Sequence, residues 1–124
     1  MFDLIDIPYD HNIKFASFDT NSMYSNIPTT DLMTTLRKLC EVNNVDNRTT
    51  QDTMRIAQTL EEQNYFDFRD TIYIQNKGLV TGAPTSSILS EAYLQYVENT
   101  TIYELLIKRK VEGYFRYVDD ILVM

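Results

Sequence analysis

The first half of the chain opens with a short alternating segment, followed by a segment with helical spacing. Residues 13–18, IKFASF, are apolar and partly alternating, which predicts a strand that ends at Asp19. In residues 29–42, TTDLMTTLRKLCEV, apolar side chains recur at intervals of three or four residues. We expect a helix there, with Thr29 or Thr30 as its N-cap. A hydroxyl at that position can accept a hydrogen bond from a backbone N–H of the first turn.

The middle of the chain predicts a second helix and a hairpin. The helix is expected over residues 50–63, where three apolar residues share one face: Met54, Ala57 and Leu60. In residues 65–76, YFDFRDTIYIQN, aromatic and branched residues alternate on both sides of Arg69-Asp70. This pattern is typical of two strands joined by a short turn.

The last third predicts a long helix and a closing hairpin. Pro84 opens the helix, which we expect over about residues 85–110, with basic residues in its last turn and Gly113 just beyond it. The closing stretch, GYFRYVDDILVM, predicts strands over residues 114–118 and 121–124. The order of elements indicates an α+β fold, in which helices pack on one face of an antiparallel sheet.

Size and composition narrow the class of protein. With 124 residues, of which 44% are hydrophobic and 23% charged, the chain has the composition of one globular domain at most. It has no run of about 18 apolar residues and no signal-peptide pattern, so we expect an intracellular protein, nuclear or cytoplasmic, without a membrane partner. One cysteine and one histidine exclude an internal disulfide and a zinc ligand set.

The pair Asp119-Asp120 is an unusual choice for the turn of a tight hairpin. Such turns favour Asn-Gly or Asp-Gly, because their central residues need positive φ. The apolar flanks predict a largely buried hairpin, in which adjacent carboxylates require a counter-cation unless one of them stays protonated. Hard oxygen ligands suit Mg²⁺, and Asp19, at the end of another strand, is a candidate third ligand. The alternatives are a solvated acidic turn and a simple strand-end cap.

Three stretches in order resemble the catalytic motifs of reverse transcriptases. FASFDTNSMYSNIP resembles the first motif, an aspartate at a strand end followed five residues later by an aromatic residue. GLVTGAPTSSILSEAYLQYVE is similar to the second, a Gly-x-Pro turn leading into a helix, and YFRYVDDIL resembles the third, the Asp-Asp hairpin. The resemblance covers about residues 12–124 and is greatest to the enzymes of Penelope-like and related non-LTR retroelements.

The resemblance implies a polymerase palm spanning residues 1–124 as a partial reverse transcriptase domain. By this resemblance, Asp19 and Asp119 of this chain would bind two Mg²⁺ ions, or Mn²⁺, with Asp120 as a supporting ligand. One ion would lower the pKa of the primer 3′-hydroxyl, and the other would hold the triphosphate and the leaving pyrophosphate. The implied partners are an RNA template, a DNA primer and a dNTP.

The resemblance also implies nucleotide-binding residues. The backbone around Ser22 and Met23 would contact the triphosphate, and the Tyr24 ring would exclude a ribose 2′-hydroxyl. Gly82 would let the backbone approach the nascent base pair. A core aromatic and an ordinary loop are the alternatives for Tyr24 and Gly82. The sequence has Ala83 where the family commonly has serine, so a side-chain hydrogen bond from that position is not expected.

The net charge of −7 argues against nucleic-acid binding if it is taken alone. The resemblance accounts for it, because the basic contacts of the family come largely from the fingers and thumb, which would lie before residue 12 and after residue 124 of a longer polyprotein. We therefore expect a truncated palm that is inactive, or nearly so, by itself. The alternatives are a non-catalytic remnant that acts as an interaction module and, with less support, a metal-dependent phosphohydrolase.

Overall fold

The computed structural model describes residues 12–124, which divide into two compact units. One unit contains residues 12–23 and 97–124, and the other contains Tyr24–Tyr96. The division falls inside a continuous helical stretch, between Tyr96 and Val97. Both units combine helices with antiparallel strands, which confirms the α+β class. No helix among the described residues is both long and apolar enough to cross a membrane.

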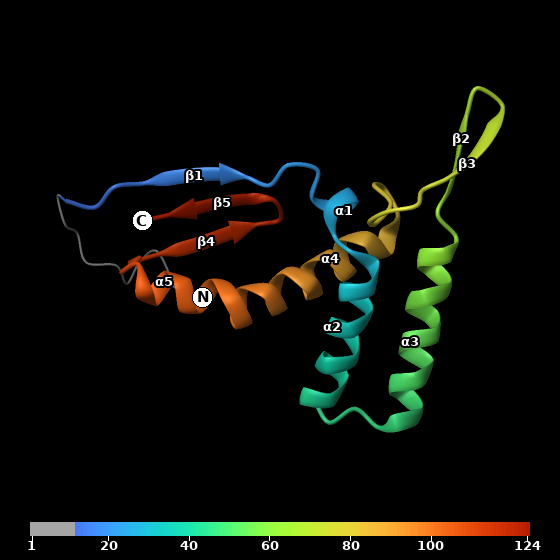
Figure 1. Cartoon of the computed structure of the whole chain (residues 1–124), viewed down its shortest axis with the longest axis horizontal. Helices are drawn as coiled ribbons and strands as arrows, with labels where there is room; N and C mark the ends of the chain where they lie inside the picture. The colour runs from blue at the N-terminus through green and yellow to red at the C-terminus, as the bar shows by residue number, and fades with distance from the viewer. Residues whose placement is uncertain (1–11) are drawn as a thin grey trace. The chain divides into compact units, whose positions relative to one another are not determined.

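The first unit is built on a three-stranded antiparallel sheet with the order β1-β5-β4 (Figure 1). Its strands are β1 (Ala16–Asp19), β4 (Tyr114–Tyr117) and β5 (Asp120–Val123). β5 lies in the centre, so the first strand of the chain pairs with the last. This long-range pairing brings together two segments from opposite ends of the described chain.

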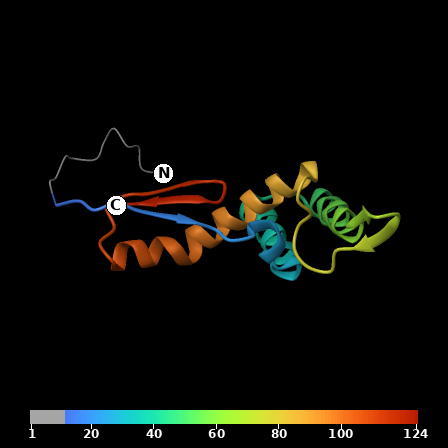
Figure 2. The same cartoon turned by 90° about the horizontal axis from the view of Figure 1, so that it is seen from above.

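The helical segment of this unit, residues 98–108, lies along one face of the sheet, as Figure 2 shows. After α4 (Pro84–Val97), the helix continues as a π-helical turn, η2 (Glu98–Ile102), and then as α5 (Tyr103–Lys108). The expected helix is thus present, but the π-helical turn was not predicted. Its sequence, ENTTI, holds asparagine and β-branched threonines, which are weak α-helix formers.

The closing hairpin has a different turn from the one predicted. Tyr117 pairs with Asp120, so Val118 and Asp119 form the two-residue loop and Asp120 is the first residue of β5. Val118 has a φ of 56° and Asp119 keeps a negative φ, which is the pattern of a type II′ turn. A β-branched residue in this region is strained, because its side chain crowds the backbone.

The predicted burial of these strands is wrong. All four residues of β1 are exposed, and β4 and β5 are mainly half-buried. β1 begins three residues later than the strand expected over residues 13–18, and Asp19 is its last residue. Only one face of this sheet of three short strands is covered by a helical segment. The apolar side chains of the strands are therefore less enclosed than their sequence suggests.

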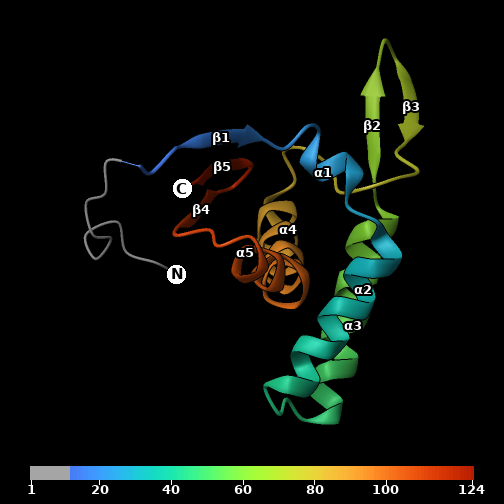
Figure 3. The same cartoon turned by 60° about the vertical axis from the view of Figure 1, so that its left-hand side comes forward.

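The second unit contains a helical pair, a hairpin and most of α4 (Figure 3). Its elements are α1 (Met23–Asn26), which begins at the last residue of the first unit, α2 (Thr29–Val42), α3 (Asn47–Glu62), β2 (Tyr65–Phe68) and β3 (Thr71–Ile74). β2 and β3 form a separate two-stranded sheet, whereas a single sheet was predicted. Their turn is at Arg69 and Asp70, as predicted, and both residues have the positive φ of a type I′ turn.

Parts of the predicted apolar faces of α2 and α3 lie in the core of the second unit. Leu32 of α2 is fully buried, and Met54 and Ala57 of α3 are buried as well, whereas Leu60 remains exposed. The prediction of a threonine N-cap on α2 is wrong: Pro28 occupies that position, where no side chain caps the helix. α3 begins three residues earlier than expected, because Asp46 accepts a hydrogen bond from the Thr49 N–H at 2.9 Å.

Candidate metal centre

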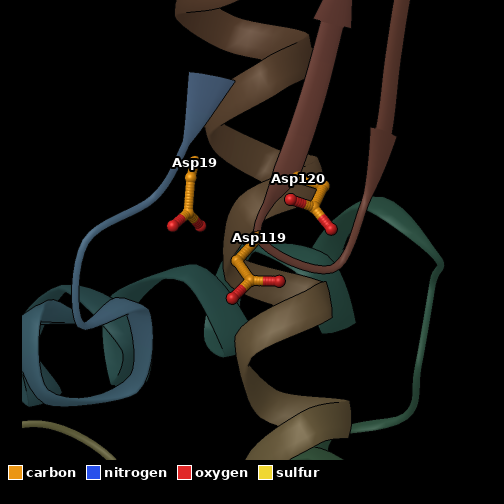
Figure 4. A group of neighbouring side chains, drawn as sticks. All are labelled: Asp19, Asp119 and Asp120. Atoms are coloured by element: carbon orange, nitrogen blue, oxygen red, sulfur yellow. The ribbon is translucent and has the colours of Figure 1, made fainter. Parts of the chain in front are cut away.

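Three aspartates gather where β1 ends and the closing hairpin turns (Figure 4). Asp19 is the last residue of β1, Asp119 lies in the turn, and Asp120 begins β5. Each offers a carboxylate oxygen, and these oxygens lie within 4.8 Å of one another. The structure therefore brings together all three of the predicted catalytic aspartates.

The sheet register explains this convergence. Asp19 is directly opposite Asp120 across the β1–β5 pair, so both carboxylates project from the same face. Asp119 is held beside them by the backbone, since the Thr20 N–H donates to the Asp119 carbonyl at 2.9 Å. Two segments that are far apart in sequence are thus joined at the aspartates themselves.

The exposure and charge of the cluster would allow it to hold a metal ion. Asp19 and Asp120 are exposed and Asp119 is half-buried, so water and a ligand can reach all three. Like charges directly opposite each other destabilise a sheet, and a cation between them removes that repulsion. Three oxygen donors with open access fit Mg²⁺ or Mn²⁺, which keep part of their shell for water and phosphate oxygens.

A second network lies on the other face of the hairpin. Side chains alternate along β4, so Arg116 and Tyr114 project away from the face that carries Asp120. Both bind Glu98 of η2: the Arg116 guanidinium makes a two-armed ion pair with its carboxylate, and the Tyr114 hydroxyl donates to it at 2.9 Å. Arg116 Nη1 also donates to the Val118 carbonyl at 3.0 Å.

The predicted nucleotide-binding residues fall in both units. Ser22 and Met23 belong to the first unit: Ser22 is exposed with a φ of 48°, and the Met23 side chain is buried. Tyr24 and Gly82 belong to the second. Tyr24 is half-buried, and its carbonyl accepts from the Leu79 N–H at 2.7 Å.

The structure requires glycine at two positions of the second motif, for a different reason at each. Gly82 has a φ of +92°, and a Cβ added there would meet no atom within 4 Å, so only its backbone conformation requires glycine. Gly78 has a φ of +71°, and a Cβ there would overlap the backbone of Ser25. Sequence reasoning singled out Gly82 and missed Gly78, whose role depends on a close approach between distant segments.

The second unit also contains an open cavity of about 700 Å³, lined by α2, α3 and the segment after β3. None of the predicted site residues line it. Glu61 forms part of its wall, with one carboxylate oxygen buried and without a hydrogen-bond partner among the described residues. Burial raises the pKa of the Glu61 carboxyl.

Sequence reasoning missed the residues that support the aspartates, which are Thr20, Glu98 and Arg116. The signal for Arg116 was a charge within an otherwise aromatic strand, YFRY, and such a charge needs a partner. Nothing local pointed to Glu98, which lies in the middle of a long helical stretch.

The sequence matches no protein-family model, and a search of curated proteins found no match either.

Proposed function

We propose that this chain is the palm of an RNA-directed DNA polymerase of the retroelement type, which transfers a nucleotide from a dNTP to a primer 3′-hydroxyl on an RNA template. The observation that carries the proposal is the convergence of Asp19 with Asp119 and Asp120. The three come from two of the motifs that resemble reverse transcriptases. Motif order alone does not require that their carboxylates lie within reach of one ion.

The resemblance to reverse transcriptases suggests the roles of the chain's own residues. Asp19 and Asp119 would hold Mg²⁺ or Mn²⁺, with Asp120 as a supporting ligand. When bound, the ions would supply charge neutralisation for in-line phosphoryl transfer and would activate the primer hydroxyl. Ser22 and Met23 would position the triphosphate through their backbone.

Nucleotide selection is assigned to Tyr24 and Gly82. The Tyr24 ring would exclude the ribose 2′-hydroxyl, so that deoxynucleotides are selected. Gly82 would let the backbone lie close to the nascent base pair. Its positive φ gives this turn a conformation that other residues adopt only with strain.

The primary experiment is a Mn²⁺ titration of the folded chain, followed by paramagnetic broadening of its amide NMR signals. We expect selective broadening at Asp19, Asp119 and Asp120, abolished by Asp119→Asn. Asp67→Asn is a matched control, because Asp67 is an exposed strand carboxylate in the separate β2–β3 hairpin. A folded chain without selective broadening would refute the proposed metal chemistry.

A second experiment tests the nucleotide directly. With Mn²⁺ present, a dNTP should perturb the amides of Ser22, Met23 and Tyr24, and the matching rNTP should bind more weakly. Tyr24→Ala should remove the preference, whereas Tyr24→Phe should retain it, since the ring provides the exclusion. Equal binding of both nucleotides to the unsubstituted chain would contradict the proposed role of Tyr24.

One observation favours a second candidate function, a non-catalytic interaction module. All eight residues of β2 and β3 are exposed, and most are large and apolar: Tyr65, Phe66, Phe68, Ile72, Tyr73 and Ile74. An apolar patch of this kind commonly marks an interaction surface. A chain that binds no metal at the aspartates but self-associates or binds a protein through this hairpin would be such a module.

A further inference from the structure

The turn that carries Asp119 is strained, and its conformation requires support. Val118 has a φ of 56°, a region that β-branched residues rarely adopt. Conformations of this kind persist where surrounding contacts hold them. The Val118 carbonyl accepts a hydrogen bond from Arg116 Nη1 at 3.0 Å, so one side chain holds the strained residue directly.

Arg116 is itself fixed in place. Its side chain is only 7% exposed, and its guanidinium makes the two-armed pair with Glu98, whose side chain is 20% exposed. One arm joins Nη2 to Oε2 at 3.3 Å and the other joins Nε to Oε1. A planar guanidinium can serve this carboxylate and the Val118 carbonyl at once, which the single ammonium of lysine cannot do with the same geometry.

The hydrogen-bond path continues to the metal ligands. On the far side of the turn, the Asp119 carbonyl accepts from the Thr20 N–H, next to Asp19. The turn is therefore attached to η2 through Arg116 and to the end of β1 through Thr20. Moving Val118 would move Asp119 relative to Asp19.

We propose that Arg116, held by Glu98, is a positioning residue that fixes the Val118–Asp119 turn so that the three carboxylates can share one cation. This inference rests on the proposed function, because it presumes that the three aspartates bind a metal ion. Arg116 reaches neither the cation nor the substrate in this role, since it lies on the opposite face of the sheet. In this role it acts through the backbone of the turn.

Arg116→Lys is the main test variant. It keeps a positive charge beside Glu98 but loses the planar guanidinium, which bonds Glu98 and the Val118 carbonyl at the same time. We expect its Mn²⁺ affinity at the aspartates to fall about tenfold or more, as for other groups that orient metal ligands. Tyr114→Phe is the matched control: it removes a hydroxyl that bonds Glu98 and Arg116 but leaves the Arg116 bond to Val118, so its affinity should stay within about twofold of the unsubstituted chain.

Rescue separates positioning from general stability. Glycine adopts positive φ without strain, so Val118→Gly should restore most of the affinity lost in Arg116→Lys. A merely structural role for Arg116 would not be corrected by a change in the turn. Wild-type affinity in Arg116→Lys, or no recovery in the double variant, would overturn the inference and leave the proposed function standing.

A readout without metal keeps the two proposals distinguishable. In the metal-free chain, the Thr20 amide should exchange with solvent about tenfold faster in Arg116→Lys than in Tyr114→Phe, because the Asp119 carbonyl is no longer held. Faster exchange in a chain that binds no Mn²⁺ would refute the proposed function while supporting the positioning of the turn. Unchanged exchange would overturn the positioning role itself.

Discussion

Asp19 lies directly opposite Asp120 across the antiparallel pair of β1 and β5, with both side chains on one face of the sheet. Two carboxylates in this relationship repel each other, which a sheet selected only for stability would avoid. A cation bound between the two carboxylates would remove that repulsion.

We expect Asp120→Asn to stabilise the metal-free chain by about 0.5 kcal/mol, because it removes the repulsion with Asp19. In Mn²⁺ at one hundred times its dissociation constant, the unsubstituted chain should gain about 2.7 kcal/mol, and the variant should gain less. Urea denaturation with EDTA and with Mn²⁺ would measure both. A variant that is less stable under both conditions would contradict the cross-strand repulsion.

Alanine substitution at the two glycines near the second motif should give unequal losses of stability. Gly82→Ala should cost about 1 kcal/mol, since only its positive φ opposes a side chain. Gly78→Ala should cost more than about 2 kcal/mol, because its Cβ would also overlap the Ser25 backbone. Chemical denaturation of both variants provides the comparison, and equal losses would show that the close approach at Gly78 is absent in solution.

Tyr114 should make stability fall at high pH. Burial, and then its hydrogen bond to Glu98, raise the pKa of the Tyr114 hydroxyl to about 12 from its ordinary value of 10.0. The folded pKa is above the unfolded one, so the stabilisation is complete below about pH 10 and is lost as pH rises towards 12. Because the ring is partly exposed, the loss should not exceed about 2 kcal/mol.

Absorbance at the tyrosinate band, combined with denaturation between pH 8 and 11, would follow this titration. Tyr114→Phe should flatten the pH dependence and remove one of the late-titrating tyrosines. Tyr103→Phe is a suitable control, since Tyr103 is exposed. A decline in stability of the same size in Tyr114→Phe would assign the effect to other groups.

Glu61 should make the chain less stable as pH rises from acid to neutral. Burial raises the pKa of its carboxyl from 4.5, so the folded state favours the protonated form. The stability contributed by that proton is fully present below about pH 4.5 and is lost as pH rises through the folded pKa. Glu61→Gln should therefore stabilise the chain at pH 7, by less than about 1 kcal/mol, and leave it unchanged near pH 3.5.

Thermal or urea denaturation at the two pH values would measure the effect of Glu61→Gln. Glu62→Gln is the neighbouring control, because Glu62 is an exposed glutamate next in the sequence. A Glu61→Gln chain that is less stable than the unsubstituted chain at pH 7 would indicate that the buried oxygen has a partner in solution.

The elements that depend on local signals were predictable. The helical spacing of Leu32 with its neighbours located α2, and Met54 with Ala57 located the buried face of α3. The turn at Arg69-Asp70 was also located, because alternating residues on both sides bracket it. These signals act between residues a few positions apart, where backbone propensity and side-chain periodicity decide the outcome.

Burial was predicted less well, since it depends on what packs against a segment. The apolar strands near the aspartates were expected to be buried, yet β1 is exposed throughout. The turn of the closing hairpin was displaced by one residue, because the pairing of Tyr117 with Asp120 selects Val118-Asp119 as the loop. Cross-strand register is set by pairing partners as well as by the turn sequence.

The sequence by itself determined the class of the fold, most helix and hairpin positions, and the three aspartates as candidates for one site. Tertiary structure alone decided that Asp19 pairs with Asp120 and that Arg116 links Glu98 to the turn. Contacts of this kind join segments that are distant in sequence. Their geometry depends on the free energy of the whole packed arrangement, which local propensity does not encode.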